Sequence, residues 1–217
     1  MFERFIQALQ TDDPGAEEPP ATRERLKARF APGAVRRMTQ LGLLVGAALR
    51  ELQLTPEDTL VYASQFGEGR ALEGYLDSFP APSPTLFQTS IHPSGVQQSL
   101  IGWQRSVGEF FPLAGGAPLV AQAVLTALIA PAPRVALCGG EARGTWLVAP
   151  GAASDRSFAF ALALTREPCA AALGRIALQP TDATGTLTLG GWFDVLHQRQ
   201  PFAGPIASGW QLQLAWT

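Results

Sequence analysis

Apolar residues return every three or four positions in several segments of the chain. Between Arg36 and Leu52 this spacing predicts an amphipathic helix, in which Gly42, Gly46 and Ala47 permit close packing against a neighbour. The same spacing predicts four further helices, over Phe2 to Leu9, Arg70 to Ser78, about Gly95 to Trp103 and Leu119 to Ile129.

Short runs of apolar and β-branched residues separate these helices and predict strands. They cover Thr59 to Ala63, Phe110 to Ala114, Arg134 to Cys138, Phe158 to Thr165, Arg175 to Leu178, Thr186 to Leu189 and Gln211 to Trp216. Several of the runs are continuously apolar and show no alternation, as is typical of strands covered on both faces. The order of elements therefore predicts an α/β fold, with a mostly parallel mixed sheet and helices on both faces.

Proline-rich stretches predict the connections and the domain division. Asp12 to Ala21 is acidic and rich in proline and is expected to be a loop, and Pro80, Pro82 and Pro84 are expected to force an extended connection from Thr85 to Ile91. We expect residues 1–35 to form an N-terminal helix and an acidic Pro-rich loop. Residues 36–217 are expected to form a single domain that ends in a β extension from about residue 174.

Composition narrows the classes of function. Apolar residues make up 47% of the chain, charged residues only 16%, and the formal net charge is −2, which gives no reason to expect a nucleic-acid partner. The basic stretch Arg23 to Arg37 is interleaved with Glu24 and Pro32, so it is interpreted as a solvated helix and turn, with binding of an acidic partner or a phosphopantetheine carrier as the alternative. No apolar run is long enough to cross a bilayer, and two cysteines without a metal-binding spacing suggest a cytoplasmic protein with reduced thiols.

A search for catalytic residues finds little. The chain has two histidines: His92 follows an apolar residue in a Pro-flanked segment, and His197 is expected to pair locally with Asp194. Cys138 ends an apolar strand and is expected to behave as a small hydrophobic residue. The sequence has no GxSxG elbow and no complete phosphate-binding loop, and carboxylates are scarce in its apolar middle, so neither a cofactor nor a metal site is expected.

The order of several segments resembles that of the β-ketoacyl synthases. The matching segments are RRMTQLGLLVGAALREL, TLVYASQFGEG, SPTLFQTSIHPSGVQQSLIG, GEFFPLAGGAPLVAQAVLTAL and RVALCGGEA. They follow one another from Arg36 to Glu141 in the order found in the N-terminal half of these enzymes. The pattern is similar to that of the short chain-length-factor-type subunits of aryl-polyene and type II polyketide systems, although His92-Pro93-Ser94 departs from it.

This resemblance implies one half of a thiolase-like fold without catalytic residues. The motif places the nucleophilic cysteine of active ketosynthases at Gly116 or Ala117, with Gly115 and Pro118 as the neighbouring alternatives, and none of the four carries a nucleophile. The histidines and the lysine of the family lie in a second copy of the fold, which these residues do not include. We therefore expect a degenerate elbow over Gly115, Gly116 and Ala117 and no catalysis by this chain.

The resemblance also implies which residues meet a partner. Leu86, Phe87 and Ile91 are the candidates for the wall of an acyl tunnel, although core packing of Leu86 and Phe87 remains an alternative. The candidates for the partner interface are Thr89, His92, Trp103, Phe110 and Phe111.

These expectations lead to a non-catalytic subunit that pairs with a full-length catalytic β-ketoacyl synthase as a heterodimer, stabilises it and shapes its tunnel. An acyl carrier protein would be an indirect partner. Two other classes stay open. One is a stand-alone acyl-transfer enzyme that uses Ser90 or Ser94 with His92, and the other is a self-associating structural protein.

Overall fold

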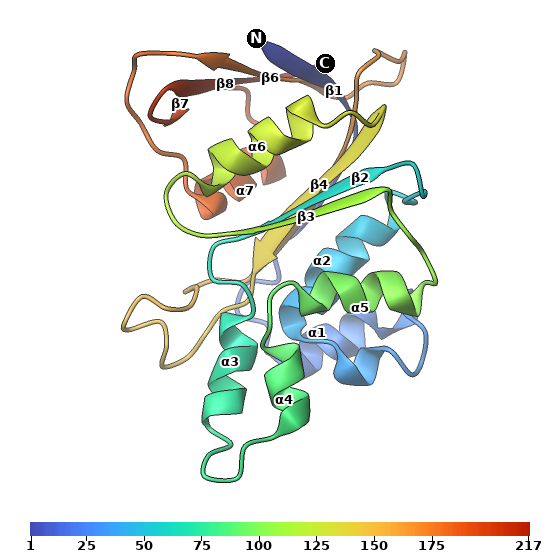
Figure 1. Ribbon diagram of the computed structural model, residues 1–217, viewed down its shortest axis with the longest axis vertical. Helices are drawn as coiled ribbons and strands as arrows, with labels where there is room; N and C mark the ends of the chain where they lie inside the picture. The colour runs from blue at the N-terminus through green and yellow to red at the C-terminus, as the bar shows by residue number, and fades with distance from the viewer.

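One mixed sheet of eight strands runs through the molecule, in the order β3-β2-β4-β5-β1-β6-β8-β7 (Figure 1). The computed structural model describes all residues, 1–217. The strands are β1 (Phe2–Asp12), β2 (Thr59–Ser64), β3 (Glu109–Ala114), β4 (Arg134–Glu141), β5 (Phe158–Thr165), β6 (Gly174–Pro180), β7 (Phe202–Ala207) and β8 (Trp210–Trp216). Parallel pairing is confined to β2 with β3 and β2 with β4, and the other five pairings are antiparallel. The predicted α/β class is confirmed, but its parallel part is limited to three neighbouring strands.

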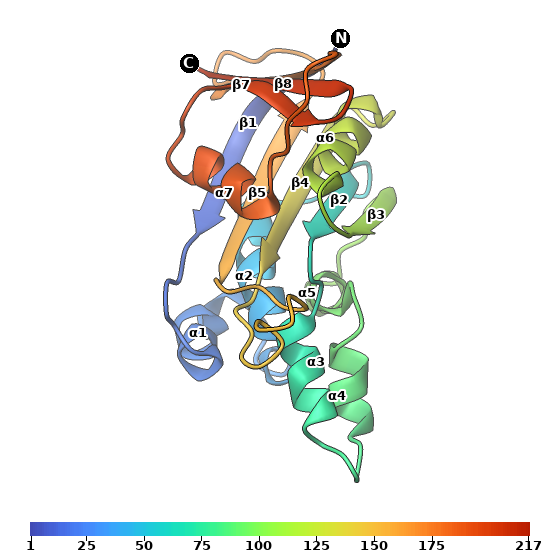
Figure 2. The ribbon, with the colours of Figure 1, turned by 90° about the vertical axis from the view of Figure 1, so that its left-hand side faces the viewer.

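Helices cover both faces of the sheet, as predicted. On one face lie α1 (Pro19–Leu26), α2 (Gln40–Arg50) and α5 (Ser94–Gly102), and on the other lie α6 (Leu119–Ile129) and α7 (Leu189–His197) (Figures 1 and 2). Each face buries its own apolar core, one centred on α6 and α7 and the other on α2. No helix combines the length and the apolar character needed to span a membrane.

Helix α2 shows how the sequence determines one of these layers. Thr39 caps its start, because its hydroxyl oxygen accepts a hydrogen bond from the Gly42 amide at 2.9 Å. Every residue from Gln40 to Leu49 is buried, since the helix lies between the sheet and α5. The small residues noted in the sequence do allow a close approach: a Cβ at Gly42 would lie 2.8 Å from the Gly95 Cα, and one at Gly46 would lie 2.4 Å from the Ser99 hydroxyl.

The N-terminal segment is a strand, so the predicted helix over Phe2 to Leu9 is wrong. Strand β1 lies inside the sheet between β5 and β6. Its pairing with β5 slips by one residue between Ile6 and Ala8, which breaks the alternation of apolar positions that identifies a strand. The buried Arg4 side chain donates to the Ala130, Ala132 and Pro133 carbonyls just beyond α6. Residues 2–12 are therefore integral to the sheet.

Two further segments differ from their predictions. Residues expected to be extended after Pro84 form helix α4 (Pro84–Thr89), because proline is tolerated in a first turn and the Ser83 hydroxyl accepts from the Leu86 amide. Thr186 to Leu189 is not a strand, since Thr188 caps α7 through the Gly191 amide at 3.1 Å. Strands β6, β8 and β7 nevertheless follow β1 in the main sheet.

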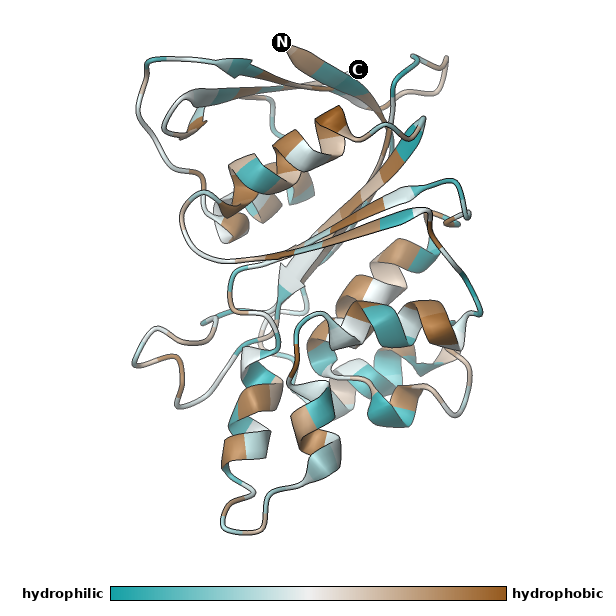
Figure 3. Ribbon diagram, viewed as in Figure 1, coloured by the Kyte–Doolittle hydropathy of each residue, from teal (hydrophilic) through white to brown (hydrophobic).

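Helices α3 (Gly69–Leu76) and α4 form a hairpin that extends away from the sheet (Figures 1 and 2). We call residues 69–89 the arm. Two connections join it to the body, residues 65–68 after β2 and residues 90–93 before α5. Figure 3 shows hydrophobic positions on both helices of the arm, well away from the two cores.

Candidate functional site

The turn between β3 and α6 corresponds to the predicted elbow. Ala114 ends the strand, Gly115, Gly116, Ala117 and Pro118 form the turn, and Leu119 begins the helix. Gly115 has φ +144°, a conformation that disfavours any side chain. All four turn residues are exposed, and none carries a group that can attack a carbonyl carbon.

Strand β3 is an edge of the sheet and pairs only with β2. Phe110 is half-buried against the α2 core, whereas Phe111 is 38% exposed. The structure thus places both aromatic interface candidates on a strand whose outer edge has no neighbour in this chain. The same strand contains Pro112. Proline lacks a backbone N–H group, so within sheets it occurs mainly in edge strands.

The tunnel-wall candidates lie on the arm or directly after it. Leu86 is 37% exposed, Phe87 50% and Ile91 47%, so packing of Leu86 and Phe87 in the core of this chain is excluded. Tyr75 on α3 contacts Phe87, with ring centroids 5.3 Å apart, and also contacts Phe79. The arm therefore presents apolar and aromatic side chains to its surroundings.

Three of the interface candidates, His92, Trp103 and Thr89, are half-buried and mainly contact other residues of this chain. His92 stacks on Tyr62 with centroids 4.8 Å apart, and Trp103 stacks on Phe30 at 5.9 Å. Both are half-buried, and neither the His92 ring nitrogens nor the Trp103 indole nitrogen has a hydrogen-bond partner. Burial lowers the pKa of His92. Thr89 is half-buried, and its hydroxyl donates to carbonyls within α4.

The serines of the rival acyl-transfer hypothesis do not engage His92. The Ser90 hydroxyl donates to the Phe87 carbonyl at 2.8 Å, and the Ser94 hydroxyl donates to the Thr89 carbonyl at 3.0 Å. Because His92 makes no hydrogen bond at all, neither serine has the base that a nucleophile of this kind needs. His197 bonds to the Thr11 hydroxyl rather than to Asp194, so that predicted local pair is wrong.

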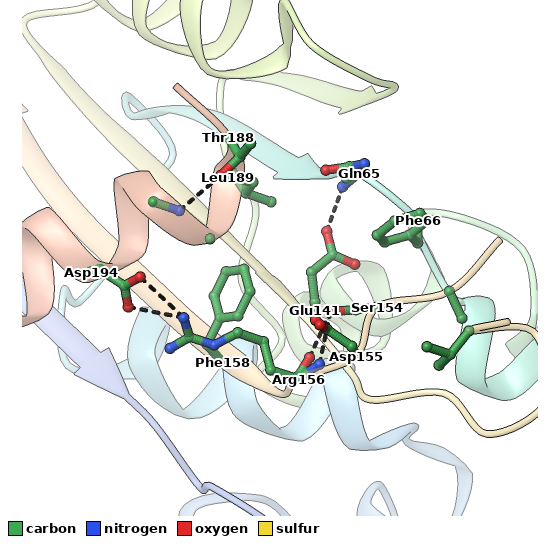
Figure 4. A pocket seen from close by; sticks show the side chains of 14 residues that line it. Gln65, Phe66, Glu141, Ser154, Asp155, Arg156, Phe158, Thr188, Leu189 and Asp194 are labelled. Carbon is green, nitrogen blue, oxygen red and sulfur yellow. Dashed lines mark hydrogen bonds and ion pairs between the residues drawn. The ribbon is translucent and has the colours of Figure 1, made fainter. Parts of the chain in front are cut away.

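A pocket of about 580 Å³ opens where β2 and β4 end and α7 begins (Figure 4). Its lining includes Gln65, Glu141, Arg156, Thr188 and Asp194. Arg156 donates to both carboxylate oxygens of Asp194, at 2.9 and 3.1 Å, and Glu141 accepts from the Gln65 amide. Arg156 and Asp194 thus form an ion pair within the pocket, whereas Glu141 bonds to a backbone amide and to the Ser64 hydroxyl.

The one serine–carboxylate contact beside this pocket is inaccessible. The Ser64 hydroxyl lies 3.1 Å from both oxygens of Glu141, but Ser64 is fully buried. Burial raises the pKa of Glu141 to about 8, so at neutral pH this carboxyl is mostly protonated and is a poor base. The structure holds no cluster of three or more His, Cys, Asp or Glu side chains arranged to bind a metal ion.

Sequence reasoning missed three buried glutamates around the base of the arm. Glu68, Glu73 and Glu141 are each less than 5% exposed, and each accepts a hydrogen bond from a backbone amide. The sequence carries a signal for two of them, because Glu68 and Glu141 each follow a glycine just beyond or at the end of an apolar strand.

Comparison with known proteins relates this arrangement to solved structures. No protein-family model matches the sequence, and no curated protein matches it. One similar structure is a ketosynthase in complex with its chain length factor from Xenorhabdus doucetiae, with a TM-score of 0.72 and 18% identity over 99% of this chain and 100% of the matched chain. The ishigamide ketosynthase/chain length factor matches with a TM-score of 0.59 and 11% identity, over 83% of this chain and 68% of the other.

A β-ketoacyl synthase from Burkholderia phymatum STM815 also matches, with a TM-score of 0.54 and 13% identity, over 86% of this chain and 66% of that one. The resemblance noted in the sequence is thus confirmed at the level of the fold. The chain has the thiolase-like fold of the ketosynthases, in a form that matches a chain of the Xenorhabdus ketosynthase–chain length factor complex from end to end.

Proposed function

We propose that this chain is a non-catalytic, chain-length-factor-type subunit that pairs with an active β-ketoacyl synthase, stabilises it and shapes its acyl tunnel in polyene, polyketide or fatty-acid-like chain elongation. The observation that carries the proposal is an unpaired edge strand together with an exposed apolar arm. Figure 2 shows β3 and α4 toward the same side of the molecule. An open strand edge can pair with another chain, and clustered exposed apolar side chains commonly mark a surface that binds a partner.

The edge strand gives the partner a way to extend the sheet. Phe110 and Phe111 lie on β3, and aromatic side chains are enriched at the centres of protein interfaces. An obligate interface of this kind buries about 2,000 Å² or more. The arm would then reach into the partner, where Leu86, Phe87 and Ile91 would form part of the tunnel wall.

The elbow supports an accessory role over catalysis. A Claisen condensation needs a thiolate at the start of the helix that follows the elbow. In this chain that position carries only Gly115, Gly116, Ala117 and Pro118, and the buried Cys138 has its pKa raised by burial, which disfavours the thiolate. The partner would therefore supply all of the chemistry.

Co-expression with a full-length catalytic β-ketoacyl synthase from the same organism tests the proposal. We expect the two chains to co-purify as a 1:1 complex, and we expect the ketosynthase to be less soluble or less stable when this chain is omitted. A chain that is monodisperse alone and does not bind the ketosynthase would refute the pairing. A stable homodimer would favour the self-associating structural protein, and acylation of the isolated chain by an activated acyl donor would favour the stand-alone enzyme.

A further inference from the structure

Two buried carboxyl groups hold the entering connection of the arm, residues 65–68, against the body. Glu141, at the end of β4, accepts from the Gln65 amide and from the Ser64 hydroxyl, on the connection that enters the arm. Glu68, on the same connection, accepts from the Gly95 amide at 3.3 Å, at the start of α5 beyond the arm. Between them these two side chains tie the entering connection to β4 and to the start of α5, which directly follows the leaving connection.

Glu73, the third buried glutamate, differs from Glu68 and Glu141 because it forms an ion pair. Glu73, on α3, accepts from the Thr145 and Leu147 amides at 2.6 and 2.9 Å and forms an ion pair with Arg70 at 2.9 Å. Burial acts to raise the pKa of Glu73, but these hydrogen bonds outweigh it and hold the pKa below its ordinary value. This carboxyl therefore stays charged at neutral pH.

No cation reaches either of the other carboxyl groups. Burial raises the pKa of Glu68 to about 7, against hydrogen bonds from Thr39 and Gly95, and raises that of Glu141 to about 8, with the charge of Glu68 adding to the effect. Neither glutamate takes part in an ion pair, whereas Glu73 does. A charge on both Glu68 and Glu141 would place two uncompensated anions under the arm.

We propose that Glu68 and Glu141 form an ionisation-controlled latch, which holds the arm against the body while they are protonated and loosens it when both are charged. The latch rests on the burial of both carboxyl groups and on the lack of an ion pair at either one, while the hydrogen bonds from the Gln65 and Gly95 amides fix their place at the base of the arm. Where the proposed function holds, the latch would also set the position of the tunnel wall carried by Leu86 and Phe87.

Charged and titratable side chains surround the two glutamates, but none of them forms an ion pair with either carboxyl group. The titratable side chains packed against the two glutamates or their loop are Tyr62 on β2, Cys138 on β4 and His92 before α5. Burial raises the pKa of both Tyr62 and Cys138, so these two stay neutral. The pocket beside Glu68 is lined by the charged residues Arg23, Arg36, Arg37, Arg70, Glu73 and Asp77, and that beside Glu141 by Asp155, Arg156 and Asp194.

The direction of the pH effect follows from the raised pKa values. A carboxyl that is exposed when the arm opens ionises near its ordinary pKa, between 4 and 5, whereas the latched carboxyl ionises only near 7 or 8. The closed arm therefore binds more protons than the open arm within that window. Its stabilisation is complete below about pH 4 and declines as the pH rises toward 8.

Hydrogen exchange of the full-length chain tests the latch directly, with the chain in complex with the ketosynthase if it requires that partner. Peptides from the arm, residues 69–89, are compared between pH 5.5 and 8.5 after correction for the intrinsic exchange rate, with peptides from α6 as the internal reference. We expect opening of the arm to increase at least about tenfold across this range, while α6 changes little. In the E68Q/E141Q variant, whose side chains cannot ionise, the increase should disappear.

The matched control is E73Q, which removes a buried glutamate from the same base but one that has a cationic partner. E73Q should loosen the arm at every pH and leave the increase at alkaline pH in place. If the double variant does not fold, E68Q and E141Q tested singly should each remove part of the increase. An arm whose opening does not change with pH, or a double variant that opens as the wild type does, overturns the latch. This readout is independent of product formation, so it fails or succeeds separately from the proposed function.

Discussion

Two glycines set the distance between α2 and α5. A Cβ at Gly42 would lie 2.8 Å from the Gly95 Cα, and a Cβ at Gly95 would lie 2.6 Å from the Gly42 Cα. Real Cβ atoms do not approach backbone atoms this closely, so the two helices could accept a methyl group only by moving apart. That movement would also displace Gly95, whose amide contacts Glu68.

Gly42→Ala should therefore destabilise the protein despite the higher helix propensity of alanine. We expect a loss of about 1–3 kcal/mol in the free energy of unfolding, as is typical of overpacked interiors. Urea denaturation followed by circular dichroism measures it. Gly190→Ala is the matched control, because Gly190 also lies in a helix but has no atom within 4 Å of the added methyl group. Equal stability of the G42A variant and the wild type would contradict the close packing.

At the residue scale, sequence reasoning recognised groups that depend on local geometry and missed those that depend on distant contacts. The small residues of α2 and the elbow glycines were identified, because both follow from spacing along the chain. The burial of Glu68 and Glu141 depends on residues 27 and 76 positions away, at Gly95 and Gln65, and no local pattern reveals such contacts. The same is true of Arg4, whose carbonyl partners lie more than 120 residues away.

At the element scale, prediction succeeded where one periodicity dominates. The bounds of α6 and β5 agree with their predicted ranges, since both are almost continuously apolar and end at polar residues or turn residues. It failed at β1, where apolar residues fall at helical spacing but a bulge shifts the strand between Ile6 and Ala8. It failed again at α4, because a proline that disrupts the middle of a helix fits its first turn.

Strand β3 is the element on which pairing should depend. Phe111→Glu places a charge on the exposed edge and should abolish co-purification with the ketosynthase, since buried aromatic anchors commonly carry at least about 2 kcal/mol of binding energy. The fold itself should change by less than about 0.5 kcal/mol, because the side chain is exposed in the free chain. Pull-down and size-exclusion chromatography measure the first effect, and thermal unfolding measures the second.

The matched control for β3 is Ile129→Glu. Ile129 is 52% exposed, but it lies at the end of α6 rather than on the edge strand. This variant should bind the ketosynthase as the wild type does. Loss of binding in both variants, or in neither, would show that β3 is not the pairing edge.

At the scale of the whole molecule, the two edges of the sheet lie in different surroundings. The sheet ends in β3 on one side and in β7 on the other, and β6 and β8 lead to β7. Helices α6 and α7 pack against the same apolar core on one face of this sheet. The β extension from residue 174 completes the cover of that face, and the exposed large apolar residues cluster on and beside the arm, with single ones on β3, α5 and α6.

The arm is the part of the molecule that should affect product length. In the proposed complex its helix α4 would form the far wall of the partner's tunnel, and Leu86 is an exposed apolar residue on that helix. Leu86→Trp adds a large ring at the wall, so the growing chain would meet it earlier and the complex should release products shorter by one or more extension units. Mass spectrometry of products from the reconstituted complex, at equal ketosynthase concentration, measures the shift.

Ile101→Trp is the control, because Ile101 is 75% exposed on α5 outside the arm, and product lengths should not change. Unchanged products from the Leu86→Trp complex, or equal shortening by both variants, would place the wall of the tunnel elsewhere.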